Sequence, residues 1–406
     1  MKHTPNSSHL IQSFEDSLTR EIQRLPVVMD HAYGATLVDV DGNEYLDFLS
    51  GIGVMSLGYS NARVQKAMQE QITRLIHTSN YFYTEPLLRL SALLCEKSFA
   101  RAVFFSNSGA EANEAAIKMA RRAGRSRHPQ KTQVISLQGS FHGRTSLALS
   151  LTDNPRVKRG FSPLPEGTLQ VPLNDSTALR AAMNPNVCAL FLEPVQGEGG
   201  IHPLDPEYLR LARSLCDTYD AALIFDEVQC GMGRIGTLFA YQHFGVTPDL
   251  MTLAKALGNG MPIAATCVGP RYADTFQSGD HGTTFGGGPL ATCTALAVVE
   301  ELLANNLPEK AKETGAYLKS KLLELQALGA DIREVRGLGL MLGAQIGCNC
   351  KPVVEKMLQR GFLINCASEN VLRFLPPLII TKEEIDRMIE AFYEILQTTP
   401  GGLCAL

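Results

Sequence analysis

The spacing of hydrophobic and polar positions changes along this 406-residue chain. Residues 34–50, GATLVDVDGNEYLDFLS, alternate apolar and polar side chains around Asp-Gly-Asn, a pattern typical of a β-hairpin. From about residue 100 to 270, short apolar runs alternate with helical periodicity at 109–124 and 206–220. The apolar runs are residues 102–106, 132–137, 187–194, 221–227, 249–254 and 263–269. This alternation predicts an α/β fold, with a mainly parallel sheet covered by helices on both faces.

The pattern differs after about residue 290. Helical stretches at 289–306 and 308–328 are followed by strand-like segments at 332–347 and 371–377 and by a last helix at 382–399. This order predicts a smaller α+β domain. We therefore divide the chain into an N-terminal segment, 1–50, that packs with the small domain, a large domain, 51–300, and the small domain, 301–406.

Composition and charge narrow the classes of function. The chain is 45% hydrophobic and 19% charged, as expected of a globular protein, and its formal net charge is −4. A protein that binds nucleic acid or anionic membranes needs a basic face, so this charge argues against both partners. No apolar stretch is long enough for a signal peptide or a membrane span, which predicts a cytoplasmic protein.

The ten cysteines contain no C-x-x-C pair, and Cys348 and Cys350 are spaced wrongly for a common zinc site. We therefore expect no metal site and free thiols. Cys230 has no neighbour in sequence that would lower its pKa, which favours a packed cysteine over a nucleophile.

Lys255 stands in DLMTLAKALGNGMP, a run that otherwise predicts burial. A buried lysine costs desolvation energy unless it is paired, loses its proton or takes part in chemistry. The alternative is an exposed lysine at the edge of a short strand or helix.

A capped helix is predicted in SNSGAEANE. Ser108 fits the N-cap, and Glu111 completes a capping box. Gly109 and Ala110 are small, so a phosphate could approach the free N–H groups of the first turn. The alternative is a helix that is merely well capped.

Asp226 ends the apolar run 221–225 and needs a partner for its charge. A protonated ring nitrogen, as in pyridoxal phosphate enzymes, is one such partner; a helix N-cap or a metal ligand are the alternatives. Lys255 follows 255 − 226 = 29 residues later, enough for one crossover helix and a strand. The two side chains would then share one cleft at the sheet edge.

Three further segments, GSFHGRT, EPVQGEGG and HGTTFGGGP, supply recognition chemistry. Phe141 can lie flat on a ring, and Arg144 can hold a carboxylate through its two-pronged guanidinium. Taken alone, Phe141 fits the core, Arg144 a surface ion pair and Glu198 a turn.

Five motifs occur in this order along the chain: SNSGAEANEAAIKMAR, FHGRT, FDEVQ-C-GMGR, HGTTFGG and VLRFLPPLIIT. With them, the chain resembles the class III (fold type I) pyridoxal phosphate aminotransferases from about residue 20 to residue 395. The resemblance is strongest to the acetylornithine, succinylornithine and ornithine aminotransferase branch. It implies a fold type I transferase, pyridoxal 5′-phosphate as cofactor, and a homodimer with shared active sites.

The resemblance implies a role for each matching residue. Lys255 would form the Schiff base with the cofactor and act as the base. The other cofactor contacts would be Asp226 to the pyridinium, Gln229 to the ring hydroxyl, Phe141 stacked on the ring, Ser108, Gly109 and Ala110 to the phosphate, and Thr284 to the phosphate of the neighbouring subunit. The substrate contacts would be Arg144 and Arg373 to carboxylates, Glu198 opposite Arg144, and Thr283.

The implied reaction moves the ω-amino group of N-acetylornithine, or a similar donor, to 2-oxoglutarate by a ping-pong mechanism, giving a semialdehyde and glutamate, as in arginine biosynthesis. The chain departs from the branch at Ile22, where a tyrosine is usual, and at Cys230 and Gly288. Ile22 leaves the donor open. The alternatives are another class III reaction, such as that of a different ω-amino acid aminotransferase, aminomutase or racemase, or a silent dimer.

Overall fold

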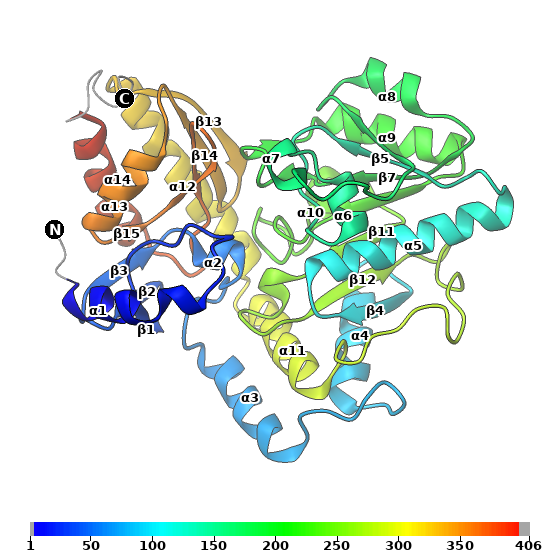
Figure 1. Ribbon diagram of the computed structural model, residues 1–406, viewed down its shortest axis with the longest axis horizontal. Coiled ribbons are helices and arrows are strands. Elements are labelled where there is room, and N and C mark those ends of the chain that lie inside the picture. Colours follow the sequence, from blue (N-terminus) through cyan, green and yellow to red (C-terminus); the bar gives the residue numbers. More distant parts are fainter. Residues whose placement is uncertain (1–3, 398–406) are drawn as a thin grey trace.

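The computed structural model describes residues 4–397, and these form two lobes (Figure 1). The larger lobe is built on a seven-stranded sheet in the order β4-β12-β11-β10-β7-β5-β6. Only β12 runs antiparallel to its neighbours, so the sheet is mainly parallel, as predicted. The strands are β4 Ala102–Ser106, β5 Gln133–Leu137, β6 Thr168–Val171, β7 Val187–Leu192, β10 Ala222–Asp226, β11 Leu250–Leu253 and β12 Ala264–Val268.

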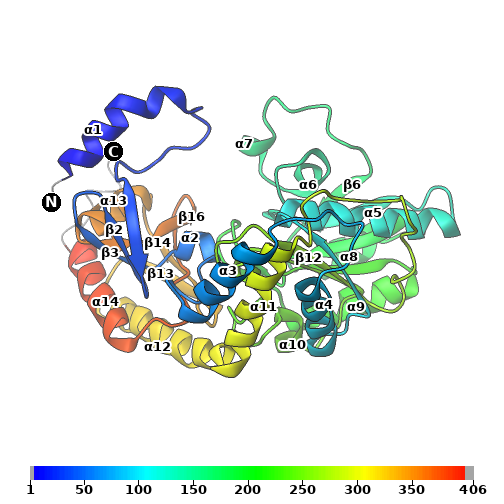
Figure 2. The ribbon, with the colours of Figure 1, turned by 90° about the horizontal axis from the view of Figure 1, so that it is seen from below.

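Helices cover both faces of this sheet because its central strands are apolar on both sides. Leu223 and Phe225 of β10 pack in the cluster that contains Leu209 of α9 (Pro206–Thr218). Ile224 points the other way, into the cluster that contains Ile117 of α5 (Gly109–Arg127). Figure 2 shows these two helices on opposite sides of the sheet. Alternation along one strand thus supplies two cores.

The smaller lobe holds an antiparallel sheet in the order β13-β14-β17-β16, with strands Ile332–Leu338, Met341–Ile346, Val371–Phe374 and Asn365–Ser368. The helices α12 Leu307–Ala327, α13 Lys351–Gln359 and α14 Lys382–Gln397 pack against it. The predicted strand 332–347 is therefore a hairpin, which turns at Gly339 with a φ of 51°. The predicted last helix extends to 399, and its last two residues lie outside the described part.

The predicted N-terminal hairpin is present as β2 Thr36–Asp39 and β3 Glu44–Asp47, with β1 Met29–Tyr33 beside β2. The carboxylate of Asp39 accepts the backbone N–H groups of Asp41 and Asn43 and so closes the turn. β3 also pairs in parallel with β15, Phe362–Leu363, near the end of the chain. This pairing supports the N-terminal segment packing with the small domain, but the boundaries at 50 and 300 stay predictions.

The remaining elements connect these layers. They are α1 Pro5–Phe14, η1 Glu15–Ser17, α2 Ser50–Gly53, α3 Ala62–Arg74, α4 Glu85–Lys97, α6 Ser146–Leu151, α7 Pro155–Lys158, α8 Ser176–Ala182, β8 Val195–Gln196, β9 His202–Pro203, α10 Ala240–Phe244, η2 Lys255–Leu257 and α11 Pro289–Ala304. Between residues 4 and 397, no single helix is long and apolar enough to cross a membrane; only the pair α11 and α12, bent by 65°, passes by length and composition.

The expectation that all cysteines are free is wrong for one pair. Cys350, at the start of α13, forms a disulfide with Cys366 of β16, and their Cα atoms are 6.0 Å apart. The two positions are 16 residues apart in sequence, and the packing of α13 against β16 brings them together. Spacing in the sequence carries no sign of this tertiary contact. Cys230 is buried with a free thiol whose pKa burial raises, as expected of a packed cysteine.

Candidate active site

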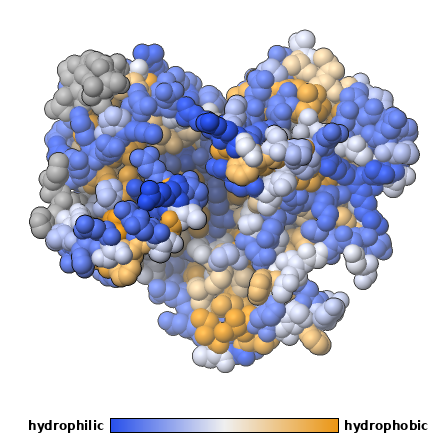
Figure 3. Space-filling model, in the orientation of Figure 1, coloured by the Kyte–Doolittle hydropathy of each residue, from blue (hydrophilic) through white to orange (hydrophobic). Residues whose placement is uncertain are grey.

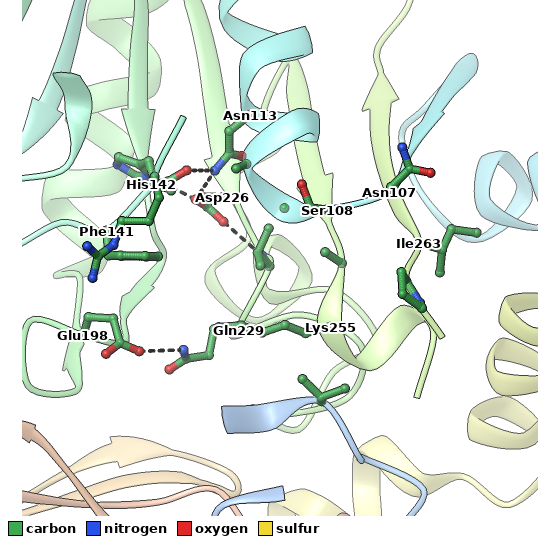
Figure 4. A pocket seen from close by; sticks show the side chains of 18 of the residues that line it. Asn107, Ser108, Asn113, Phe141, His142, Glu198, Asp226, Gln229, Lys255 and Ile263 are labelled. Carbon is green, nitrogen blue, oxygen red and sulfur yellow. Dashed lines mark hydrogen bonds and ion pairs between the residues drawn. The ribbon is translucent and has the colours of Figure 1, made fainter. Parts of the chain in front are cut away.

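A cavity of about 410 Å³ lies where β4, β7, β10 and β11 end, at the edge of the sheet that faces the smaller lobe. Nine of the residues singled out in the sequence line it, and Figure 4 shows how several of them converge. These nine are Ser108, Gly109, Ala110, Phe141, Arg144, Glu198, Asp226, Gln229 and Lys255.

Lys255 follows β11 directly and begins η2. Its φ of 45° is in the left-handed region, which is unusual for a residue with a side chain and typical of functional sites. Gly258 allows the tight turn that follows, because a Cβ there would lie 1.9 Å from the carbonyl oxygen of Met261. Burial lowers the pKa of Lys255, and this effect outweighs the negative charge of Glu198, which acts to raise the pKa. A neutral amine is therefore more accessible here than in water.

Asp226 is the last residue of β10 and is only 4% exposed. Its Oδ2 accepts a hydrogen bond from Asn113 Nδ2 at 2.8 Å and lies 2.8 Å from His142 Nδ1, while Oδ1 accepts the N–H of Val228 at 3.1 Å. Asn113 is itself fixed, because Thr252 Oγ1 donates to its Oδ1 at 2.7 Å. The carboxylate is thus held in one orientation on the cavity wall.

The sequence reasoning did not find Asn113 or Thr252. A signal for Asn113 does exist. It lies on the buried face of α5 between Ala112 and Ala116, where a polar side chain needs a buried partner.

The N-terminus of α5 faces the same cavity. Ser108 caps the helix by accepting the N–H of Glu111 at 3.3 Å, as predicted. In a capping box, the Glu111 carboxylate would accept the N–H of the N-cap residue, Ser108. Here it accepts the N–H of Asn107 instead, at 2.7 Å, one residue before the N-cap. Within residues 4–397, no acceptor meets the N–H groups of Gly109 and Ala110. Together with the helix dipole, they form a site suited to an anion.

Phe141 is oriented through its backbone. Its N–H donates to Glu193 Oε2 at 3.0 Å, and the N–H of Gly197 donates to the other oxygen at 3.2 Å. Burial raises the pKa of Glu193 to about 7, although the nearby His142 acts in the opposite direction. Glu193 also lines the cavity. The sequence reasoning did not single it out, although an acid directly after the buried strand β7 is a signal of the same kind as Asp226.

Arg373 reaches the site from β17 of the smaller lobe and is 1% exposed. Its Nη1 donates to Glu198 Oε1 at 2.5 Å and to Gln229 Oε1 at 3.2 Å. Its Nε donates to Oδ1 of Asn365 in β16 at 3.1 Å. Burial raises the pKa of Glu198, but the charge of Arg373 and their hydrogen bond outweigh it and lower the pKa overall. Asn365 is a further contact that the sequence reasoning missed.

Four of the residues singled out in the sequence differ from the rest in position or exposure. Thr283 and Thr284 do not line the cavity: Thr283 Oγ1 accepts a bond from Asn107 Nδ2 at 3.3 Å, and Thr284 is exposed. Arg144 lines the cavity but is exposed, with its guanidinium 5.8 Å from the centroid of the Phe141 ring. Ile22 is 60% exposed and lines a separate hollow in the N-terminal segment.

The cavity fits pyridoxal phosphate. An amine for the aldehyde, a fixed carboxylate for the ring nitrogen and an aromatic face stand around it as Lys255, Asp226 and Phe141. Gly109 leaves room at the phosphate end, because a Cβ there would lie 2.8 Å from Val228 Cγ1. The His142 ring contacts Asp226 through Nδ1 and packs edge-on against Phe191. Its buried Nε2 has no described hydrogen-bond partner, so the hydrogen bond of this ring goes to the Asp226 carboxylate.

Comparisons with known proteins agree with this chemistry. A sequence model of the family described as aminotransferase class-III matches residues 18–396. The chain is 50% identical over 376 residues to the acetylornithine aminotransferase of Methanocaldococcus jannaschii, covering 92% of this chain and 94% of that one. It is 44% identical to the enzyme of the same name from Clostridium acetobutylicum, covering 92% of this chain and 97% of that one.

Solved structures give the same result. The ornithine aminotransferase of Toxoplasma gondii superposes with a TM-score of 0.93 at 32% identity, over 98% of this chain and 97% of that one. The N-acetylornithine aminotransferase of Stenotrophomonas maltophilia superposes with a TM-score of 0.82 at 36% identity, over 95% of this chain and 98% of that one. The family match over nearly the whole chain, together with these relatives, shows that the chain belongs to the class III aminotransferases, which are pyridoxal-phosphate-dependent enzymes.

Proposed function

We propose that this aminotransferase moves the ω-amino group of N-acetylornithine, or of a close N-acylated analogue, to 2-oxoglutarate. The products are the corresponding semialdehyde and glutamate. The observation that carries the proposal is the pair formed by the buried Arg373 and Glu198 across from Lys255. An arginine with a removable counter-ion suits an enzyme that accepts a dicarboxylate in one half-reaction and a donor without a second carboxylate in the other.

In this proposal, the residues around the cofactor divide the work. Bound pyridoxal phosphate supplies an electron sink for the C–H bond beside the reacting amine. Asp226 keeps the ring nitrogen protonated, and Phe141 and Gln229 hold the ring. Ser108, Gly109 and Ala110 bind the phosphate at the start of α5. Lys255 Nζ would take the proton from the carbon that bears the reacting amine and pass it on to the cofactor side, a role that its lowered pKa supports.

The substrate contacts follow the charges. Arg144 binds the carboxylate of the amino donor, and Thr283 stands near the substrate. Glu198 pairs with Arg373 while the donor is bound, as the described contact of 2.5 Å suggests. When glutamate or 2-oxoglutarate enters, its carboxylate takes the place of Glu198 on Arg373. The two half-reactions therefore use one cavity in turn, which is a ping-pong sequence.

The proposal includes a homodimer, in which Thr284 reaches the phosphate of the neighbouring subunit. Thr284 is exposed, and the adjacent Phe285 is 67% exposed. Further exposed apolar side chains occur on α3 and on the chain between α3 and α4: Ile72, Leu75, Ile76, Tyr81, Phe82 and Tyr83. Figure 3 shows apolar surface gathered in the part of the molecule formed by α3 and α11. A patch of this kind is typical of an interface. The expected location, the cytoplasm, is part of the same proposal.

A panel of donors tests the reaction. Each donor is mixed in the absence of 2-oxoglutarate with the yellow enzyme, and loss of the cofactor's visible absorbance gives the rate of the first half-reaction. We expect N-acetylornithine to react with a kcat/KM at least about tenfold above those of ornithine and 4-aminobutyrate, because one well-matched contact contributes that factor. Glutamate should bleach the enzyme and yield 2-oxoglutarate. If N-acetylornithine fails to react while another ω-amino compound does, the proposed donor is wrong.

A further inference from the structure

A second, smaller cavity adjoins the active site at Arg144. Its volume is about 210 Å³, and Arg144 lines both cavities. The other lining residues are mostly apolar: Ser146, Leu149, Val157, Phe161 and Leu164. They come from α6, from α7 and from the chain that follows α7, which Figure 2 shows projecting beyond α6.

The guanidinium of Arg144 is available to a ligand. In the part of the chain from residue 4 to residue 397, no carboxylate or carbonyl forms an ion pair or hydrogen bond with it. Its guanidinium carbon lies 5.8 Å from the centroid of the Phe141 ring. A guanidinium that stacks on an aromatic ring and has free N–H groups is well suited to bind a carboxylate.

The position of a donor in the larger cavity follows from its two ends. With the ω-amine at Lys255 and the carboxylate at Arg144, the α-carbon lies beside Arg144, because it bears the carboxylate directly. One substituent of that carbon is the chain that leads back to Lys255. The other, the α-nitrogen, therefore lies beside Arg144, the residue that also lines the smaller cavity.

We propose that the smaller cavity is an acyl subsite, which takes the N-acyl group of an N-acyl ω-amino acid. This rests on the proposed function, in which Arg144 binds the donor carboxylate. Leu149 is 4% exposed and forms a fixed wall, while Phe161 is 63% exposed and stands at the opening to solvent. An acyl chain longer than acetyl therefore extends past Phe161.

The same cavity selects against a free α-amine. An ammonium group there would face the positive charge of Arg144 and the apolar side chains of Leu149, Val157 and Leu164. Like charge and lost hydration both oppose its binding. Acylation removes the charge and adds apolar surface that these walls can cover.

Filling the cavity tests the proposal. Val157→Phe places a ring in the smaller cavity without touching the larger one, which Val157 does not line. The donors are N-acetylornithine and 5-aminopentanoate, which has the same chain and carboxylate but no α-nitrogen, with glutamate as reference. We expect kcat/KM for N-acetylornithine to fall about 10- to 100-fold, the range expected when a small group is excluded from a matched pocket. The values for 5-aminopentanoate and glutamate should stay within about twofold, since neither has an acyl group.

A second variant acts in the opposite direction. Phe161→Ala widens the opening, so the ratio of kcat/KM for N-benzoylornithine to that for N-acetylornithine should rise. Leu169→Ala is the matched control: Leu169 is 47% exposed on β6 and lines neither cavity. This control should leave every ratio unchanged.

The possible outcomes separate the two proposals. If Val157→Phe lowers all three substrates equally, or none, while the protein stays yellow, the acyl subsite is wrong. If the unmodified enzyme does not react with N-acetylornithine but does react with 5-aminopentanoate, the proposed donor itself is wrong. A selective loss confined to acylated donors supports both.

Discussion

Removing the side chain of Asn365 should impair one half-reaction and leave the other intact. Asn365 contacts Arg373 and does not line the cavity that contains Lys255. Its Oδ1 is the acceptor for Arg373 Nε at 3.1 Å, whereas Glu198 and Gln229 bind Nη1. Because Arg373 is 1% exposed, water does not easily replace the lost acceptor.

The magnitude follows from that contact. A hydrogen bond to a charged group contributes about 1.5–3 kcal/mol, and each 1.4 kcal/mol is a factor of ten. With Asn365→Ala, we expect KM for glutamate and 2-oxoglutarate to rise about 10- to 100-fold, because the guanidinium loses its fixed direction. Asn365→Asp should impair glutamate more, since its added carboxylate competes with the substrate for Arg373. N-acetylornithine should react normally, because the pair of Arg373 with Glu198 remains.

The assay is a stopped-flow measurement of cofactor absorbance, with glutamate and with N-acetylornithine in separate mixes. Glu369→Ala is a matched control, because Glu369 lies in the exposed turn that follows β16. If Asn365→Ala slows both half-reactions by the same factor, Asn365 supports the whole lobe rather than Arg373. If neither changes, the contact has no role in binding. Either result refutes the reasoning.

Other variants test the cofactor site. Lys255→Ala should bind pyridoxal phosphate without covalent attachment and lose transamination, which mass spectrometry and activity assays check; retained steady-state turnover would contradict the assignment. Asn113→Ala should weaken cofactor binding about tenfold in a titration, because Asp226 loses a charge-assisted hydrogen bond. Gly109→Ala should weaken it similarly, since the added Cβ would lie 2.8 Å from Val228 Cγ1, and Val228→Ala in the same chain should restore it. The raised pKa of Glu193, about 7 against 4.5 in the unfolded chain, favours folding with a protonated carboxyl, so this contribution is present below pH 4.5 and is lost as the pH rises through 7. The loss is about 3 kcal/mol, and thermal unfolding between pH 5 and 7.5 should be less pH-dependent in Glu193→Gln.

The main sheet and the helix start were predictable because they depend on local pattern. Each of the apolar runs from 102–106 to 263–269 became a strand, and Ser108 caps α5 because its side-chain oxygen accepts the N–H of Glu111. The edge strand β6, Thr168–Val171, was not predicted. It is short and half-buried, so its alternation is too weak to detect without its neighbour β5.

The site residues that were missed act through other residues. Asn113, Glu193 and Asn365 each hold a residue that the motifs had marked: Asp226, Phe141 and Arg373. Their partners come from elements that are far apart in sequence, so only the fold shows the contact. The disulfide of Cys350 and Cys366 was missed for the same reason.

Arg144 and Arg373 have opposite surroundings, and under the proposed function this difference explains how one cavity can serve two substrates. Arg144 is exposed, so water can hydrate its charge between substrates. Arg373 is buried, and an unpaired buried guanidinium costs several kcal/mol, so it needs an anion at every stage. Glu198 supplies that anion in this structure, and under the proposed function a substrate carboxylate takes its place. Asn365 is neutral and does not compete for this charge, so it can hold the guanidinium in place while its anionic partner is exchanged. Under the proposed function, Arg373 can therefore bind glutamate in one half-reaction and pair with Glu198 in the other.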